Sequence, residues 1–298
     1  MRAVNGESAA ARRPARCPRE PRGAMPSYDP VTALLRGLDV LRLVNRLPRA
    51  TVREIHQATG LSQPTVVRML ETLIHAGFVT RQPGQPFYLP TGRTLELSAG
   101  YEMQREVGIA ATPTMTALRQ RIGWPSDIAV FDGDAMVVVH TSRDEGGRFL
   151  FQRRPGFRAP ILATSLGLAF LAHCGPAERE RALDLAARSR EPWDAVARQP
   201  EALAALLQDI RRRGYAVMNE AYSRRDYGGL ACSIGVPVLV REEAVAALNL
   251  MYLREAIDET TVVARLLPAL RQAAGELGGM LAGLWHPEGA AADDHPRA

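Results

Sequence analysis

Apolar residues recur at helical spacing in two neighbouring segments of the N-terminal third of the chain. The first segment begins at Thr51, and Glu54 three positions later completes the pattern of a capping box. Gly60 suits a left-handed turn, and Ser62 then precedes a second segment that has Pro64 in its first turn. The apolar positions of this second segment predict one inward face: Val66, Met69, Leu70 and Leu73. The pattern therefore predicts two short helices joined by a tight turn.

The outer face of the second predicted helix carries polar side chains near its N-terminus: Ser62, Gln63, Thr65 and Arg68. Glutamine can bond an adenine edge, arginine a guanine edge or a phosphate, and threonine a phosphate or a thymine methyl group. A DNA-recognition helix needs these side chains, although any αα-hairpin with a polar outer face shares the pattern. We interpret residues 51–77 as a helix-turn-helix.

Residues 78–90 alternate apolar and polar positions on either side of a Pro-Gly pair, which predicts a β-hairpin. The tip of this hairpin carries three side chains that suit a phosphate backbone or a minor groove: Arg81, Gln82 and Gln85. A hairpin, or wing, of this kind commonly accompanies a recognition helix. The two patterns together favour DNA binding over a protein-interaction hairpin.

Helical patterns flank this region on both sides. Before it, Asp29 and Pro30 open a segment with a broad apolar stripe that runs to about Leu47, and we expect this helix to back the recognition pair. After it, residues 93–123 are again helical in pattern, with Pro113 as an interruption. We therefore predict a connecting helix followed by a second helix of the next domain. Exposed apolar residues on the connector suit a dimer face.

From Ser126 onward the pattern changes to apolar runs and hairpin turns. The predicted strands are residues 126–132, 135–142, 149–154, 230–240 and 244–253. The predicted helices are residues 164–174, 176–187, 201–213 and 258–284. This order of strands, helices, strands and helix predicts an α/β sensor-like domain with an antiparallel sheet, and an α+β chain as a whole.

Composition and charge divide the chain into five parts. These are a tail over residues 1–27, a winged helix-turn-helix domain over 28–92, a linker helix over 93–112, a sensor-like α/β domain over 113–284 and a tail over 285–298. The first tail holds six arginines against two glutamates and has no apolar core, so we expect it to be disordered and to add non-specific DNA affinity. An alternative is that translation begins at Met25.

Several enzyme classes are excluded by residue usage. The 298 residues contain no lysine, which excludes a Walker A loop, a pyridoxal phosphate Schiff base and Ser-x-x-Lys acyl transfer. No GxGxxG or GxSxG motif is present, the three cysteines show no CxxC spacing, and the six histidines form no ligand pair. No apolar run approaches membrane-spanning length. We expect a cytoplasmic protein that is not an enzyme and holds neither a metal nor a cofactor.

Four ordered pieces of the chain carry a family resemblance: GLSQPTVVRMLETLIHAGFVTR, FDGDAMVVVHTSR, PGFRAPILATSLGLAFLA and RGYAVMNEAYSRRDYGGLACSIGVPV. With these pieces, residues 28–284 resemble the IclR family of bacterial transcription regulators. The resemblance implies a winged helix, a linker helix, a GAF-like effector domain, and a homodimer or dimer of dimers on a palindromic or repeated operator. WPSDIAVFDGDAMVVVH and LGLAFLAHC look most like the MhpR-type regulators of aromatic-acid catabolism.

The resemblance also implies an effector pocket. Carried over residue by residue, its lining would be Ala163, Thr164, Glu220, Cys232, Asn249 and Met251. Relatives that bind small acids usually have Ser-x-Ser where this chain has Asn-Leu-Met, so the departure favours a larger, partly aromatic acid. A carboxylate would suit the helix N-terminus at Thr164, with a ring against Met251 and Ile128 and with Arg158 as a pairing cation.

Cys232 requires separate consideration, since a lone cysteine can be a nucleophile. An apolar strand would raise the pKa of its thiol, so we interpret it as a wall residue.

The sequence thus predicts a transcription factor whose partners are a double-stranded DNA operator, a small organic acid and a second copy of itself, with no membrane. Effector binding would change the spacing or order of the two winged helices through the connector. Two alternatives remain open. One is a small-molecule-binding enzyme whose hairpin serves docking, and the other is a regulator whose C-terminal domain only dimerises.

Overall fold

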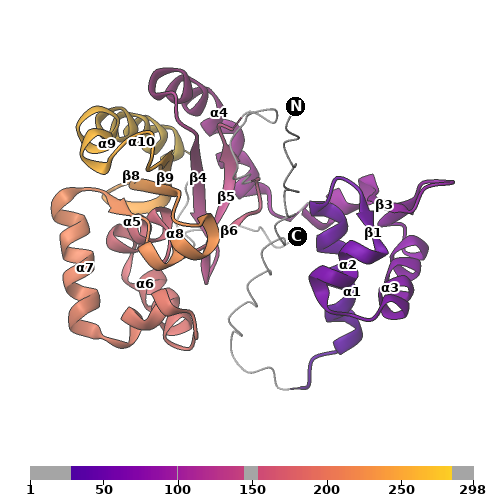
Figure 1. The fold of residues 1–298 in the computed structure, drawn as a ribbon. Helices are drawn as coiled ribbons and strands as arrows, with labels where there is room; N and C mark the ends of the chain where they lie inside the picture. Colours follow the sequence, from indigo (N-terminus) through magenta and orange to yellow (C-terminus); the bar gives the residue numbers. More distant parts are fainter. Residues whose placement is uncertain (1–27, 99, 144–153, 284–298) are drawn as a thin grey trace, which may run out of the picture. The chain divides into compact units, whose positions relative to one another are not determined.

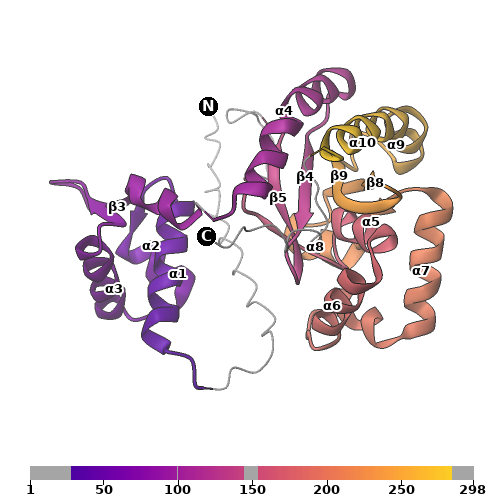
Figure 2. The same ribbon diagram turned by 180° about the vertical axis from the view of Figure 1, so that it is seen from behind.

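The chain forms two compact units, Met1–Gly100 and Tyr101–Ala298, which are drawn in Figures 1 and 2. The computed structural model describes residues 28–98, 100–143 and 154–283. The predicted tails over 1–27 and 285–298, and the predicted strand over 149–154 except for its last residue, lie outside the described residues. The predicted domain boundaries remain predictions. No described helix is long and apolar enough to cross a membrane.

The first unit is a winged helix. Its helices are α1 (Thr32–Arg46), α2 (Val52–Thr59) and α3 (Gln63–His75), followed by a 3-10 helix, η1 (Gly92–Ser98). Its strands β1 (Ala50–Thr51), β2 (Val79–Arg81) and β3 (Phe87–Pro90) form an antiparallel sheet in the order β1-β3-β2. The core joins all of these elements except η1: Val40, Leu41, Val44, Ala50, Ile55, Val66, Leu70, Val79 and Tyr88.

Local capping chemistry sets the ends of α2 and α3. The Thr51 hydroxyl accepts from the Glu54 N–H at 3.2 Å while the Glu54 carboxylate accepts from the Thr51 N–H at 3.0 Å, so the predicted capping box is confirmed. Gly60 ends α2 in the left-handed region with φ 73°, and Ser62 caps α3. The predicted helix-turn-helix is confirmed.

The expectation for α1 is only half right. Val40, Leu41 and Val44, in its C-terminal half, are buried as predicted. Its N-terminal half carries four apolar side chains that are 43–67% exposed: Val31, Leu34, Leu35 and Leu38. α1 is longer than α2 and α3, and although Gly37 lies close to Met69 of α3, the described residues leave these four side chains exposed. The apolar stripe of α1 therefore packs into the core with α2 and α3 mainly through its C-terminal half.

In the part of the chain that the structure describes, the second unit is built on a six-stranded antiparallel sheet. The antiparallel arrangement is as predicted, whereas its two short edge strands were not predicted. Its strand order is β6-β5-β4-β9-β8-β7. The strands are β4 (Ser126–Phe131), β5 (Ala135–Thr141), β6 (Arg158–Pro160), β7 (Ala216–Val217), β8 (Ala231–Val240) and β9 (Glu243–Leu253). The long β9 pairs with β4, and β8 pairs with β9, so both C-terminal strands extend the first hairpin into one sheet.

Helices cover both faces of this sheet (Figure 1). α4 (Glu102–Ile122) and α10 (Leu267–Leu281) pack on one face and on each other. The buried helix α5 (Ser165–His173) packs on β8 and β9 from the other face, and α6 (Pro176–Ala187) and α7 (Pro200–Arg213) contact α5. The remaining elements are η2 (Pro192–Arg198), α8 (Glu220–Tyr227) and α9 (Glu259–Arg265).

Two helix predictions in this unit are wrong. The sequence predicts two helices that meet near Pro113, but α4 is one helix that contains this proline, and η1 precedes it. Pro113 removes one backbone hydrogen bond, and the burial of Val107, Met115 and neighbouring apolar side chains on the sheet outweighs that loss. The predicted last helix is divided at Leu266 into α9 and α10, and Pro268 lies in the first turn of α10, where a proline is tolerated.

Candidate DNA and effector sites

The N-terminal turn of α3 faces solvent. The side chains of Gln63 and Arg68 are exposed, as a recognition helix requires. The Ser62 and Thr65 hydroxyl oxygens lie 2.8 Å apart, and Ser62 Oγ also accepts from the Thr65 N–H. These two hydroxyls therefore stabilise the start of the helix, which leaves Gln63 and Arg68 as the side chains best placed to reach a base edge.

The wing presents cations from both of its edges. Arg81 on β2 places its guanidinium carbon 5.8 Å from the centre of the Tyr88 ring. On the opposite side of β3, Arg49 lies 5.2 Å from the centre of the Phe87 ring. The turn is closed by a hydrogen bond from the Gln85 N–H to the Gln82 carbonyl at 3.1 Å. Stacking on the rings holds both guanidinium groups against the wing while their donors face solvent.

Sequence reasoning missed Arg49, which is exposed. The only sequence pattern that could have indicated a role for Arg49 is its position directly before Ala50 and Thr51, the short strand β1.

The start of α5 is buried and capped. The Thr164 hydroxyl accepts from the Gly167 N–H at 3.1 Å and donates to the Pro160 carbonyl at 3.0 Å. The Ser165 hydroxyl lies 2.7 Å from that of Ser233 on β8. Ala163 and Thr164 have no exposed surface. The predicted anion site at this helix N-terminus therefore lies inside the unit, against the sheet.

Asn249 and Met251 lie on the sheet face that α5 covers. In the strand register Asn249 is opposite Gly235 and Met251 is opposite Ser233. A Cβ on Gly235 would be 2.5 Å from the Ser165 carbonyl oxygen, so this face meets the first turn of α5. Register partners in an antiparallel pair project to the same face. The structure thus brings Asn249 and Met251 together with the α5 N-terminus.

Ile128 and Cys232 lie on the other face of the sheet. Each directly neighbours a residue of the α5 face in its strand, so alternation points its side chain toward α4 and α10. Burial raises the pKa of the Cys232 thiol, which agrees with an unreactive cysteine. Neither side chain shares a face with Asn249.

Arg158 and Glu220 are engaged elsewhere. Arg158, on the edge strand β6, forms ion pairs with Asp132 and Asp134 in the turn between β4 and β5. Glu220 is exposed at the start of α8 and pairs with Arg254 and, at 3.0 Å, with Arg224. An effector carboxylate would have to displace the two aspartates before it could pair with Arg158, whereas Glu220 is itself an anion and would repel it.

A buried polar cluster beside Asn249 was not predicted. The Asp127 N–H donates to Asn249 Oδ1 at 2.9 Å, and the Asp127 carboxylate accepts from the Thr141 hydroxyl at 2.8 Å. Arg143 pairs with the same carboxylate at 3.4 Å and donates to the Met251 sulfur at 2.9 Å. The Asp127 side chain is fully buried and that of Arg143 is 8% exposed. Asp127 near the start of β4 and Arg143 just after the end of β5 are charged residues beside largely apolar strands. This pattern in the sequence could have revealed the cluster.

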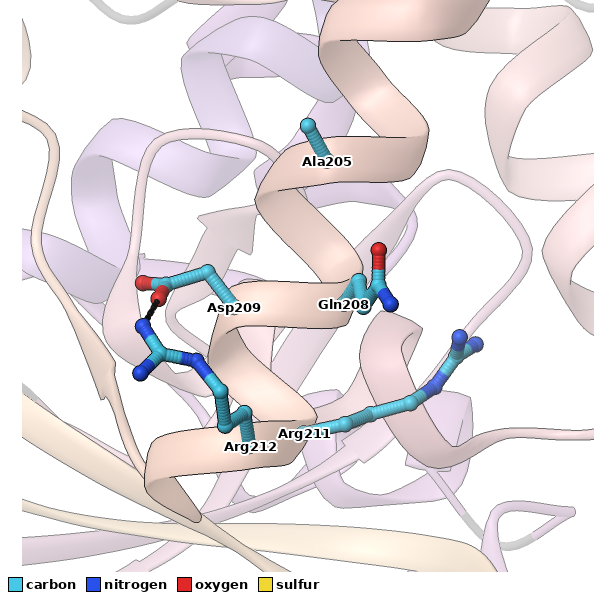
Figure 3. A pocket seen from close by; sticks show the side chains of 5 residues that line it. All are labelled: Ala205, Gln208, Asp209, Arg211 and Arg212. Atoms are coloured by element: carbon cyan, nitrogen blue, oxygen red, sulfur yellow. Dashed lines mark hydrogen bonds and ion pairs between the residues drawn. The ribbon is translucent and has the colours of Figure 1, made fainter.

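One surface hollow lies apart from these residues. It has a volume of about 670 Å³ and is lined by Ala205, Gln208, Asp209, Arg211 and Arg212 on the outer side of α7. Figure 3 shows Arg212 paired with Asp209 and Arg211 directed away from them. Its lining includes none of the predicted site residues.

Two family models match the chain. The model described as the IclR helix-turn-helix domain matches residues 33–83, and the model described as the bacterial transcriptional regulator IclR C-terminal matches residues 100–278. The Pca regulon regulatory protein of Pseudomonas putida is 27% identical over 260 residues, which is 86% of each chain.

Solved structures agree with this match. A putative transcriptional regulator from Rhodococcus sp. RHA1 is 26% identical with a TM-score of 0.60, covering 86% of this chain and all of that one. An IclR homologue from Microbacterium hydrocarbonoxydans, solved with 4-hydroxybenzoate, is 23% identical with a TM-score of 0.59, covering 85% of this chain and all of that one.

Proposed function

The chain belongs to the IclR family of bacterial transcriptional regulators, and we propose that an aromatic acid bound in its second unit controls the operator affinity of its winged helix. It is a regulator with a DNA-binding domain and a C-terminal ligand-binding domain, and its relatives are named as regulators rather than enzymes. The observation that carries the aromatic-acid proposal is the position of Asn249 and Met251 beside the buried N-terminus of α5.

The α5 N-terminus supplies the anion-binding part of the proposed site. The first N–H groups of a helix have no acceptor within the helix, and the helix dipole favours negative charge there. Thr164 already satisfies the Gly167 N–H, so the N–H groups of Ser165 and Leu166 are the ones that helix geometry directs at a ligand. A carboxylate is the functional group that fits these donors best.

Met251 supplies an apolar surface for the rest of the ligand. Its thioether is polarizable and adapts to aromatic rings, and it lies two residues from Asn249 on the same face. The names of two similar proteins support this choice: one regulates the Pca regulon, and the other was solved with 4-hydroxybenzoate. An aromatic acid therefore suits the proposed site better than a small hydrophilic acid.

The closed state of this site provides a way to regulate. Ala163, Thr164, Asn249 and Met251 are all buried to within 3% of full burial. A ligand can enter only if the surrounding elements separate, so it binds one arrangement of the unit in preference to another. A ligand with such a difference in affinity shifts the population between the two arrangements.

We propose that the chain acts as a homodimer or a dimer of dimers. The apolar stripe of Val31, Leu34, Leu35 and Leu38 on α1 is large and exposed, which is typical of an interaction surface. Two copies would place two recognition helices on successive turns of DNA. Sedimentation of the Leu35→Asp variant tests this proposal, because a charge in a buried interface should shift the protein toward monomer. An unchanged molecular mass would contradict a role for α1.

Two measurements on the full chain test the regulatory function. Thermal unfolding against acids from glyoxylate to hydroxylated phenylpropionates identifies ligands, because a ligand that binds only the folded state raises Tm by mass action. Fluorescence anisotropy with the DNA directly upstream of the protein's own gene then measures whether the same acid changes DNA affinity. A Tm shift with aromatic acids and a changed affinity are expected. No Tm shift with any acid would favour a C-terminal domain that only dimerises.

A further inference from the structure

The side-chain amide of Asn249 is only half satisfied. Its oxygen accepts from the Asp127 N–H, but among the residues that the structure describes its nitrogen, Nδ2, has no hydrogen-bond partner. Asn249 has no exposed surface, so bulk water cannot replace the missing acceptor. Buried polar groups are nearly always paired, and an unpaired donor destabilises the protein that contains it. This nitrogen therefore calls for an acceptor that the described residues do not supply.

The strand register locates this donor. Thr141, Asp127, Asn249 and Gly235 form one row across β5, β4, β9 and β8, and all four positions project to the face that α5 covers. Gly235 is in close approach to the backbone of Ser165, the first residue of α5. The row thus runs from the buried Asp127 carboxylate to the helix N-terminus, with the Asn249 amide between them.

The charges at the two ends of the row differ. At one end, Asp127 and Arg143 form a buried pair, so among the described residues their opposite charges offset each other there. At the other end, the α5 N-terminus favours a single carboxylate. A second carboxylate beside Asp127 would add an unpaired buried negative charge, which is costly. The acceptor that suits Nδ2 is therefore an uncharged oxygen.

We propose that Asn249 Nδ2 donates to an uncharged oxygen of the effector, a hydroxyl or a carbonyl, while the carboxylate of the effector lies at the α5 N-terminus. This inference rests on the proposed function and narrows it. The effector is a hydroxy- or oxo-substituted aromatic acid rather than an unsubstituted acid or a dicarboxylate. Asn249 is then the residue that selects for the second oxygen.

The test compares ligands that differ only in this oxygen. Dissociation constants of benzoate, the three monohydroxybenzoates and terephthalate are measured by calorimetry on the full chain and on the Asn249→Leu variant. In the wild type, the best monohydroxybenzoate should bind roughly tenfold to a hundredfold more tightly than benzoate. In the variant this preference should fall to about threefold or less. Terephthalate should bind no better than benzoate.

Controls separate binding from folding. Thermal unfolding followed by circular dichroism shows whether the second unit of the variant is folded, and Asn249→Ser serves as a second variant, because a serine at position 233 already fits this face. The ratio of the affinities for a monohydroxybenzoate and for benzoate is measured on a single protein. A general loss of stability in a variant therefore does not change this ratio.

Each remaining outcome decides against the inference. Equal wild-type affinity for benzoate and every monohydroxybenzoate would overturn it and leave the aromatic-acid proposal intact. A preference that survives in both variants would overturn the role of Asn249, and tight binding of terephthalate would overturn the uncharged oxygen. If none of these aromatic acids binds the wild type, the inference fails together with the aromatic part of the proposed function.

Discussion

The two units present their candidate side chains in opposite ways. On the winged helix, Gln63 and Arg68 face solvent, whereas in the second unit Thr164 and Asn249 have no exposed surface. A DNA duplex cannot enter a protein interior, so the side chains that read it must already project outward. A small acid is held best where water is excluded and each hydrogen bond is stronger. The same polar residue types therefore serve two different kinds of recognition.

This contrast has a consequence for mutation. In the second unit the proposed site and the core are the same residues, so changes there should alter stability and binding together. On the winged helix the proposed contacts are separate from the core, so changes there should alter binding alone. Four substitutions test this contrast.

The largest effect is expected at Gly167 in α5. A Cβ at this position would be 2.1 Å from the Ile161 carbonyl oxygen, and backbone atoms cannot yield as a flexible side chain can. Gly167→Ala should lower the free energy of unfolding of the second unit by about 3 kcal/mol or more. Urea unfolding followed by circular dichroism measures this change.

Gly279 in α10 is the matched control for that experiment. Nothing lies within 4 Å of a Cβ built there, so Gly279→Ala should stabilise its helix by roughly 0.5 to 1 kcal/mol. Equal effects of the two substitutions would show that the close approach of α5 to the preceding turn is not a constraint.

The next effect is expected for DNA binding at Arg68. Arg68→Ala should weaken operator binding by about 1 to 3 kcal/mol if the guanidinium reads a base, with stability changed by less than about 0.5 kcal/mol. Anisotropy titration and thermal unfolding measure the two quantities. Arg36→Ala removes the same charge from an exposed position on α1 and serves as the control. Equal losses from the two variants would contradict base reading by Arg68.

The two units also differ in how far the sequence could predict them. The helix ends at Thr51, Gly60 and Ser62 depend on residues within three positions of one another, and all three predictions are confirmed. Arg49 escaped prediction because it reaches the wing only after β1 pairs with β3. Structural features that depend only on neighbouring residues, such as these helix ends, can be predicted from the sequence alone.

In the second unit the determinants are distant in sequence. Which side chains share a face with α5 depends on the pairing of β4 with β9, whose residues are more than a hundred positions apart in the sequence. Ile128 and Cys232 fit the composition of an apolar pocket, but strand alternation places them on the other face. Pro113 likewise interrupts the pattern of α4 without breaking the helix, because packing on the sheet outweighs local preference. Sequence therefore predicted the sheet better than the site.

A smaller effect is expected from the cap of α2. Thr51→Ala removes the hydroxyl that accepts from the Glu54 N–H, and loss of such a cap costs about 1 kcal/mol. The unfolding of the winged helix should shift while ligand-induced stabilisation of the second unit stays unchanged. Thr51→Ser keeps the hydroxyl and should restore most of the loss. If Thr51→Ser were as unstable as Thr51→Ala, the methyl group of Thr51, rather than its capping hydroxyl, would be what stabilises this turn.

The smallest effect is expected at Arg49, and it sharpens the contrast within the winged helix itself. Its guanidinium stacks on Phe87 at the edge of the wing rather than on the recognition helix, so we expect it to contact phosphate alone. Arg49→Ala should weaken binding of specific and unrelated DNA alike by no more than about 1 kcal/mol, and should reduce the slope of log affinity against log salt by about 1. Titrations at several salt concentrations with both DNAs measure this. Arg68→Ala should instead reduce the preference for the specific sequence, because a base contact is lost only where that base is present. If Arg49→Ala reduced sequence preference as strongly, the wing edge would also read bases, and the division between a reading helix and a positioning wing would not hold.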